Sequence, residues 1–164
     1  MKIHNPANGT VITDVDIDTS AAVRAKYHRA RAAQTHWSGL PIKKRLATIA
    51  AFRDRLAAMH EALARTLTEE VGKPIRQSRN ELNGLTGRLD FFLAESQRTL
   101  RSETVLADLD NKLEERISHE PLGVIANISA WNYPYFVGSN VFVPALIAGN
   151  AVLYKRSGYA TFTG

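Results

Sequence analysis

The sequence predicts an α/β protein in which a layer of helices and a β-hairpin precede a unit of strand, helix and strand. Between residues 20 and 100, apolar residues recur at the spacing of one helix face. Between 105 and 117 they alternate with polar residues, as in a strand. The stretch from 121 to 154 has no Asp, Glu, Lys or Arg, which indicates elements buried inside protein. Strand, helix, strand in this order forms one right-handed βαβ unit of a parallel sheet.

The N-terminal segment predicts a strand pair and a first helix. A turn cluster at 5–9 separates Ile3 from the apolar residues of 11–17, which favours two short strands. The helix that follows needs a capping side chain at its start, and Gly39-Leu40-Pro41 ends it, with Pro41 suited to a first helical turn. The candidate caps are Asp18, Thr19 and Ser20, and the expected apolar face carries Val23, Tyr27, Ala30 and Trp37.

A single helix is expected from 42 to 71, because apolar residues form one stripe opposite a charged face. Gly72 can take the left-handed conformation that ends a helix, and Pro74 cannot continue it. A third helix follows, in which Gly84 and Gly87 each cost about 1 kcal/mol relative to Ala, so a closely packed neighbour is expected at both. The stripe of the 42–71 helix consists of Ile42, Leu46, Ile49, Leu56, Met59, Leu63 and Leu67; the third helix carries Ile75, Leu82, Leu85, Leu89 and Phe92.

A β-hairpin is predicted around the turn at 110–112, and it would need something outside itself to pack on. Its alternating apolar residues are Val105, Ala107, Leu109, Leu113 and Ile117. The expected organisation is therefore a strand pair plus three helices in 1–100, the hairpin in 101–120, and the start of a parallel sheet in 121–164.

Composition excludes several classes of function. The 164 residues are 45% hydrophobic and 23% charged, which fits one globular domain. The net charge of +5 permits an acidic partner, but the arginines recur along amphipathic segments, which favours solvated helix faces. A basic nucleic-acid-binding protein is the alternative that this charge allows, and no motif supports it, so no nucleic acid partner is expected. The sequence has no cysteine, which excludes disulfides, thiolate metal sites and a thiol nucleophile; no metal is expected.

The uncharged stretch from 121 to 154 is long enough to resemble a membrane span, for which about 20 apolar residues suffice. Turn and helix-breaking residues interrupt it, so no membrane association is expected. These are Asn127, Asn132, Pro134, Asn140, Pro144 and Asn150. The N-terminus has no apolar region behind a basic start, which gives no sign of a secretory signal and makes a cytoplasmic location the default expectation.

Several segments resemble motifs of the aldehyde dehydrogenase superfamily, and together they cover essentially the whole chain in order. Residues 69–74 (Glu-Glu-Val-Gly-Lys-Pro) resemble "E-x-GKP", and 120–125 (Glu-Pro-Leu-Gly-Val-Ile) resemble "EPLGV". Residues 130–134 (Ala-Trp-Asn-Tyr-Pro), followed by 144–155 (Pro-Ala-Leu-Ile-Ala-Gly-Asn-Ala-Val-Leu-Tyr-Lys), resemble "PWNFP…PALAAGN…V-x-K". The opening Asn5-Pro6-Ala7 also fits. The resemblance implies the N-terminal part of that fold, with an oligomerisation-type hairpin and the first βαβ unit of a Rossmann-like sheet.

The resemblance implies oxidation of a small-molecule aldehyde to a carboxylic acid with NAD or NADP as cofactor, in a complete enzyme that is a homo-oligomer. In the family a cysteine attacks the aldehyde, an asparagine amide holds the resulting oxyanion, hydride passes to the cofactor, and a glutamate activates water. Asn132 matches the oxyanion donor, a group whose removal typically costs about 10²–10³ in rate. The alternative is that Asn132 only caps the helix beginning at Pro134.

The cofactor positions implied by the resemblance lie at the ends of the two predicted parallel strands, where ligands bind in α/β sheets. They are Ile128, Ser129, Ala130 and Trp131 after the first strand, and Lys155, Ser157 and Gly158 after the second. A core tryptophan is the alternative for Trp131. Lys155 matches a lysine that hydrogen-bonds the adenosine ribose.

Gly158 departs from the family, which usually continues Lys-Pro-Ser-Glu where this chain has Lys-Arg-Ser-Gly. Loss of the ribose-binding carboxylate favours a shift toward NADP, with Arg156 available for the 2′-phosphate, or else reflects decay under no selection. Tyr133, Val137 and Asn140 match positions of the family's aldehyde tunnel, and Asn140 is polar where many members have an aromatic residue.

The catalytic cysteine, the glutamate base and the glycine-rich segment of the family would lie beyond residue 164. We therefore expect a partial aldehyde dehydrogenase, truncated before the cysteine and inactive as an isolated chain. The alternative is a non-catalytic remnant or interaction subunit that pairs with a full-length homologue.

Overall fold

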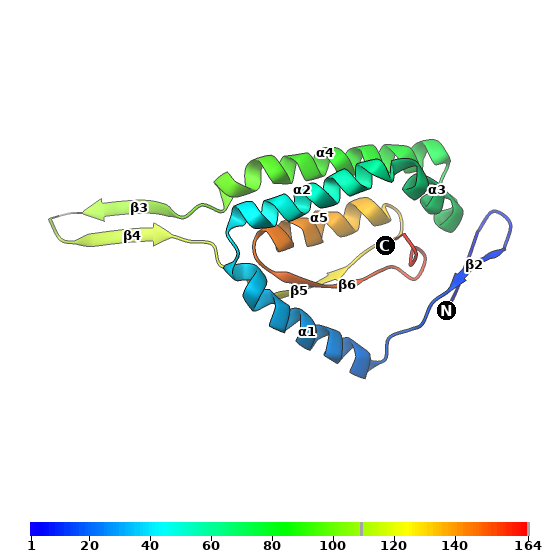
Figure 1. Ribbon diagram of the computed structural model, residues 1–164, viewed down its shortest axis with the longest axis horizontal. Coiled ribbons are helices and arrows are strands. Elements are labelled where there is room, and N and C mark those ends of the chain that lie inside the picture. Colours follow the sequence, from blue (N-terminus) through cyan, green and yellow to red (C-terminus); the bar gives the residue numbers. More distant parts are fainter. Residues whose placement is uncertain (109, 164) are drawn as a thin grey trace.

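The computed structural model describes residues 1–108 and 110–163 and shows helices on both sides of a small parallel sheet (Figure 1). Helices α2 and α4 lie over α5, α5 lies over β5 and β6, and α1 covers the opposite side of these strands (Figure 1). The elements are β1 (Lys2–His4), β2 (Val11–Asp14), α1 (Ser20–Gly39), α2 (Ile42–Ala58), α3 (His60–Val71), α4 (Ile75–Thr99), β3 (Glu103–Asp108), β4 (Leu113–Ile117), β5 (Val124–Ile128), α5 (Pro134–Ile147) and β6 (Ala151–Lys155). The predicted α/β class is confirmed.

The core lies between the four helices α2 to α5. Helix α5 has no charged residue because α4 and α2 cover one side and the sheet covers another, so no face is left mainly to water. Burying a leucine or isoleucine of this core contributes about 1.5–3 kcal/mol. The buried cluster consists of Ile49, Ala64, Leu82, Leu85, Leu89, Val143 and Ile147.

The N-terminal strand pair is confirmed: β1 and β2 pair antiparallel. Thr19 is the capping residue of α1, because its side-chain oxygen accepts from the Ala22 N–H at 3.2 Å. The prediction of a buried apolar face on α1 is wrong for the first half of the helix, since Val23 and Tyr27 are exposed. The second half of α1 is fastened to the end of α5, where the Trp37 indole N–H donates to the Leu146 carbonyl at 2.7 Å.

The prediction of a single helix from 42 to 71 is also wrong. Helix α2 ends at Ala58 and α3 begins at His60, with Met59 between them at φ −102° and ψ 8°. The apolar stripe runs through the break because α2 and α3 both pack on α4. A change of direction at Met59 lets both segments contact the same helix, and no Gly or Pro marks it in the sequence.

The expectations for the glycines are met at two positions of three. Gly72 ends α3 in the left-handed conformation, at φ 74°. A methyl group at Gly84 would lie 3.8 Å from the Phe136 ring, so α4 and α5 approach closely there. The expectation is wrong for Gly87, where nothing lies within 4 Å of the same position.

The predicted hairpin is confirmed, with β3 and β4 antiparallel and projecting from the helical layer (Figure 1). In its turn, Asp108 accepts hydrogen bonds from the Asn111 side chain and from the backbone of Asn111 and Asp110, and these bonds lower the pKa of Asp108. Leu109 of the predicted apolar set lies outside the described residues. The large apolar residues of the described hairpin, Val105, Leu106, Leu113 and Ile117, are exposed.

The predicted βαβ unit is confirmed as a parallel pair of β5 and β6 joined through α5, with Val124 opposite Ala151 and Ile128 opposite Lys155. Two side chains fasten α5 to this pair. The Asn127 amide donates to the Gly138 carbonyl at 2.8 Å. Tyr154 of β6 lies against Gly138, whose lack of a side chain makes room for the phenol.

No helix in the described part of the chain combines the length and apolar character needed to cross a membrane.

The contact between Gly138 and Tyr154 predicts the effect of a methyl group at this position. In Gly138→Ala the new Cβ would lie 2.2 Å from the Tyr154 hydroxyl and 2.9 Å from its Cζ. We expect a net loss of stability, because overpacking costs about 1–3 kcal/mol and the gain in helix propensity is about 1 kcal/mol. Urea unfolding of the whole chain measures the difference.

Gly87→Ala is the matched control, because it also lies within a helix and its Cβ meets nothing within 4 Å. It should stabilise the chain by up to about 1 kcal/mol. Tyr154→Phe should restore part of the loss in Gly138→Ala by removing the hydroxyl. Equal effects of the two alanine substitutions would show that α5 does not pack on Tyr154 as described.

Candidate functional site

The carboxyl ends of β5 and β6 bring the predicted cofactor residues to one edge of the sheet. Ile128 lies opposite Lys155, and the Ser129 N–H donates to the Lys155 carbonyl at 3.0 Å. Ile128 and Lys155 are exposed, whereas Ser129 is buried. Ligands of parallel α/β sheets bind just outside this edge. The Lys155 ammonium makes no ion pair within the described residues and can donate to a ligand there.

Trp131 is 55% exposed, so the alternative of a core tryptophan is wrong. Its ring packs edge-on against Tyr159, with 5.6 Å between centroids. Trp131, Gly158 and Tyr159 line one cavity of about 680 Å³ together with residues of β1, Pro6 and the end of α3. The segments after β5 and after β6 therefore share a cavity, and Trp131 and Gly158 are the predicted cofactor residues that line it.

The segment after Gly158 is held by Glu70, a residue to which the sequence analysis assigns no role. The Glu70 carboxylate is buried and accepts from the Phe162 N–H at 2.5 Å and the Thr163 N–H at 2.6 Å. Ser157, also buried, accepts at its hydroxyl from the Tyr159 N–H at 3.1 Å. The only sequence signal for Glu70 is its place in the 69–74 motif.

Asn132 lies in the exposed turn between β5 and α5. The alternative that it caps α5 is wrong, because Tyr133 occupies the N-cap position and its side chain makes no capping hydrogen bond. The Val137 N–H donates instead to the Tyr133 carbonyl at 2.8 Å. Within the described residues, the Asn132 side-chain amide has no hydrogen-bond partner and is free to donate to a ligand.

A buried ion pair lies directly behind Asn132. The Lys73 ammonium donates to Glu81 Oε2 at 2.6 Å and to the Asn132 carbonyl at 2.6 Å. It also lies 3.9 Å from the centroid of the Tyr133 ring. The side chains of Lys73 and Glu81 are 10% and 0% exposed. Lys73 belongs to the 69–74 motif, but nothing in the sequence singles out Glu81.

The first turn of α5 is already occupied by a carboxylate. Glu81 Oε1 accepts from the Tyr135 N–H at 3.0 Å and the Phe136 N–H at 3.3 Å. Helix N-termini with free N–H groups bind phosphate in many dinucleotide-binding folds. The amides of α5 serve Glu81 instead, so a cofactor phosphate does not find its donors at this helix end.

Two of the three predicted tunnel residues lie in one cavity. Tyr133 and Val137 line a cavity of about 660 Å³ between α4 and α5. Asn140 does not belong to the lining that the described residues form. The remaining lining residues are Arg76, Gln77, Asn80, Glu81, Gly84 and Phe136.

Tyr135 is a structural hydrogen-bond donor on the opposite side of α5. Its hydroxyl donates to the Leu63 carbonyl at 3.2 Å. Burial, with the nearby Glu70 and Glu81 carboxylates, raises the pKa of Tyr135 well above its ordinary value. The phenol therefore stays protonated at neutral pH and does not act as a base.

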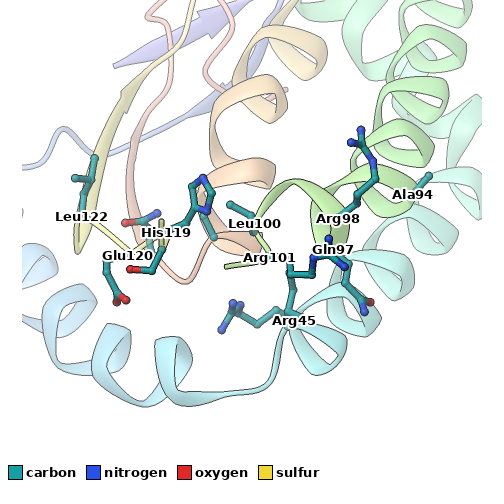
Figure 2. Close-up of a pocket in the computed structure, with 13 residues that line it drawn as sticks. Arg45, Ala94, Gln97, Arg98, Leu100, Arg101, His119, Glu120 and Leu122 are labelled. Atoms are coloured by element: carbon teal, nitrogen blue, oxygen red, sulfur yellow. The ribbon is translucent and has the colours of Figure 1, made fainter. Parts of the chain in front are cut away.

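A larger cavity, of about 960 Å³, lies at the base of the hairpin and contains none of the predicted site residues (Figure 2). Arg45, at its floor, donates to the backbone carbonyls of Ile147, Ser38 and Leu40, and burial lowers the pKa of Arg45. Arg98 of the same cavity pairs with Glu95. Arg45 therefore serves the scaffold, and the candidate site remains at the edge of the sheet.

In the part of the chain that the structure describes, no group of three or more His, Asp or Glu side chains could hold a metal ion.

A parallel strand pair with free donors at its carboxyl edge is typical of α/β proteins that bind nucleotides. The model of the aldehyde dehydrogenase family matches residues 1–164, and the chain belongs to this family. The 3,6-anhydro-α-L-galactose dehydrogenase of Streptomyces coelicolor is 34% identical over 157 residues, which are 96% of this chain and 31% of that protein.

Solved structures of the family share the fold. The NADP-dependent glyceraldehyde-3-phosphate dehydrogenase of Bacillus halodurans, complexed with NADP, matches with a TM-score of 0.92 and 27% identity, over 100% of this chain and 35% of that one. The NAD-dependent benzaldehyde dehydrogenase of Corynebacterium glutamicum matches with a TM-score of 0.91 and 26% identity, again over 100% and 35%. The chain thus spans about a third of the length of its relatives.

Proposed function

We propose that this chain supplies the oxyanion donor and part of the cofactor site of an NAD(P)+-dependent aldehyde dehydrogenase, whose nucleophile and general base come from other residues of a complete enzyme. The observation that carries the proposal is the free, exposed amide of Asn132 beside the carboxyl edge of the β5–β6 pair. The overall reaction converts an aldehyde, water and NAD(P)+ into a carboxylate, NAD(P)H and two protons.

The residues at the sheet edge fit a dinucleotide. NAD(P)+ supplies the hydride acceptor when bound. The exposed Lys155 ammonium donates to ribose hydroxyls, and the exposed Trp131 offers an apolar wall of the 680 Å³ cavity. The proposal covers both cofactors, since one solved relative is NADP-dependent and another is NAD-dependent.

Asn132 acts on the aldehyde oxygen. When a thiolate of the complete enzyme adds to the carbonyl carbon, the C=O π electrons move to the oxygen, and the amide N–H donates to the negative charge that develops. Tyr133 and Val137, which line the adjoining cavity, contact the rest of a small-molecule aldehyde. Asn140 makes no direct contribution to that cavity in this geometry.

The hairpin supports a second proposal, that a complete enzyme is a homo-oligomer and that this chain can pair with a full-length homologue. Val105, Leu106, Leu113 and Ile117 expose apolar surface on a hairpin that projects from the helical layer (Figure 1). Exposed apolar patches on a strand pair of this kind favour association.

The chain alone should not oxidise aldehydes, because it has no cysteine and no other residue of the site can replace the thiolate. Purified chain incubated with a panel of aldehydes and either cofactor should give no NAD(P)H absorbance above a blank prepared from the same host without the chain. Aldehyde-dependent reduction that copurifies with the chain through successive columns would contradict this.

Asn132 is tested in a chimera that joins residues 1–163 to the remaining two thirds of an active relative. Asn132→Ala should lower kcat by about 10²–10³, because one oxyanion donor is lost. Asn83→Ala is the control: Asn83 is an exposed residue of α4 whose amide oxygen lies 3.0 Å from His60 Nε2, away from the site, and the substitution should leave kcat unchanged. Comparable kcat values for the two variants would refute the oxyanion role.

Gly158 and Lys155 are tested in the same chimera by cofactor titration. Lys155→Ala should weaken binding of both cofactors. Gly158→Glu is sterically allowed, since nothing lies within 4 Å of the new Cβ, and its carboxylate should accept from ribose hydroxyls. We expect NAD+ affinity to improve by about 1 kcal/mol and NADP+ affinity to fall through repulsion of the 2′-phosphate. Unchanged affinities for both cofactors after Gly158→Glu would place Gly158 away from the ribose.

A further inference from the structure

We propose that the buried Lys73–Glu81 pair is a positioning device that fixes the turn from 131 to 136 and thereby the Asn132 amide. The functional part of this inference rests on the oxyanion role proposed for Asn132. The structural part stands on its own contacts. Lys73 lies in the connection between α3 and α4, and Glu81 lies within α4, so a helical layer outside the sheet controls the geometry of the site.

Glu81 holds the turn from its helical side. The first N–H groups of a helix have no partner within the helix. At α5, Pro134 has no N–H, and the next two N–H groups, of Tyr135 and Phe136, both donate to Glu81 Oε1. A carboxylate is also the charge that a helix N-terminus favours. Glu81 therefore caps α5 from a different helix.

Lys73 holds the turn from its strand side. Its ammonium donates to the Asn132 carbonyl and lies over the Tyr133 ring, while its third interaction, with Glu81 Oε2, closes the ring of contacts. The Asn132 carbonyl and the Tyr135 N–H are thus both fixed by one ion pair. Only Tyr133 and Pro134 lie between them, and proline has a fixed φ, so the backbone beside the Asn132 side chain has little freedom.

The backbone conformation before α4 sets the position of Lys73. Gly72 adopts φ 74° and turns the chain out of α3, and Pro74 follows as the N-cap of α4. The 69–74 motif thus places an ammonium group behind the turn. Because only three residues connect α3 and α4, the two helices set the position of the Lys73 side chain without a contribution from the sheet.

The energetics of a buried ion pair favour a role in geometry over a role in stability. Removing two charges from water offsets most of the attraction between them, and apolar residues of similar volume often replace such a pair without loss. Removing only one partner is costly, because it leaves a buried charge uncompensated. A pair whose remaining hydrogen bonds all go to one turn specifies the conformation of that turn.

The exposed ion pairs of α4 offer a matched control. Arg79 pairs with Glu61 at 2.8 Å, and both side chains are nearly half exposed. Arg79 lies two residues before Glu81 on the same helix and makes no contact with the turn among the described interactions. Arg79→Gln therefore removes an ion pair from α4 without touching the proposed device.

The experiment uses the full chain, labelled with nitrogen-15, and measures amide hydrogen exchange at Tyr135 and Phe136 and the fast backbone motion of Asn132. In the unaltered chain these first-turn amides should be protected although they lack helical partners. In Glu81→Ala their protection should fall by about tenfold or more, the factor expected for a charge-assisted hydrogen bond, and Asn132 should become more mobile. The core amides of Leu85 and Leu89 report the loss of global stability that an unpaired Lys73 causes, and Tyr135 and Phe136 should lose more protection than they do.

Substitutions of Lys73 separate positioning from general stability. Lys73→Met should raise the mobility of Asn132, and Lys73→Arg should restore rigidity because it keeps the cation and its donors. Glu81→Gln keeps one acceptor oxygen and should retain part of the protection at Tyr135 and Phe136. Arg79→Gln should change neither quantity.

Unprotected Tyr135 and Phe136 amides in the unaltered chain would overturn the inference, even if every Glu81 or Lys73 variant failed to fold. An equal response to Arg79→Gln and Glu81→Ala would overturn it too. These outcomes differ from failure of the proposed function, which would appear as an unchanged kcat for Asn132→Ala in the chimera while the exchange and mobility results stand.

Discussion

The structure depends on the burial of α5 between a helical layer and a parallel strand pair. A helix covered on two sides has no face for charged residues, which is why α5 contains none. Burial also means that the polar groups of α5 need partners inside the protein. Asn127 satisfies a carbonyl in its middle, Glu81 satisfies the amides of its first turn, and Arg45 donates to the carbonyl of its last residue.

The candidate site follows from this arrangement. The turn that leads into α5 carries Asn132, and the strand that follows α5 ends at Lys155, so the helix fixes both halves of the site relative to each other. The helical layer adds Lys73 and Glu81 behind the turn and Glu70 behind the segment after Gly158. Residues distant from the sheet edge therefore control the backbone at that edge.

The hairpin and the site lie at different ends of the molecule, and different interactions hold them in place (Figure 1). The hairpin is held by its own strand pairing and by the Asp108 turn, and its apolar side chains remain exposed. The site is held by buried carboxylates from α3 and α4. A partner on the hairpin would thus bind an element that is already formed.

The sequence by itself determined the elements that local rules control. Periodicity predicted the strand pairs, α4 and the βαβ unit, and Thr19, Gly72 and Pro134 marked helix ends because capping and φ depend on neighbouring residues only. The resemblance singled out Asn132, Trp131 and Lys155, which the fold brings to one edge of the sheet.

Only the tertiary structure decided the break at Met59, the exposure of Val23 and Tyr27, and the open space at Gly87. These features depend on what packs against each helix, and a sequence pattern does not show which neighbour that is. The hydrogen-bond partners of Glu70 and Glu81 are distant in the sequence: Glu70 accepts from Phe162 and Thr163, and Glu81 accepts from Tyr135. A carboxylate on a helix has the same local signature whether it faces water or caps another helix, because its partner is chosen by the fold.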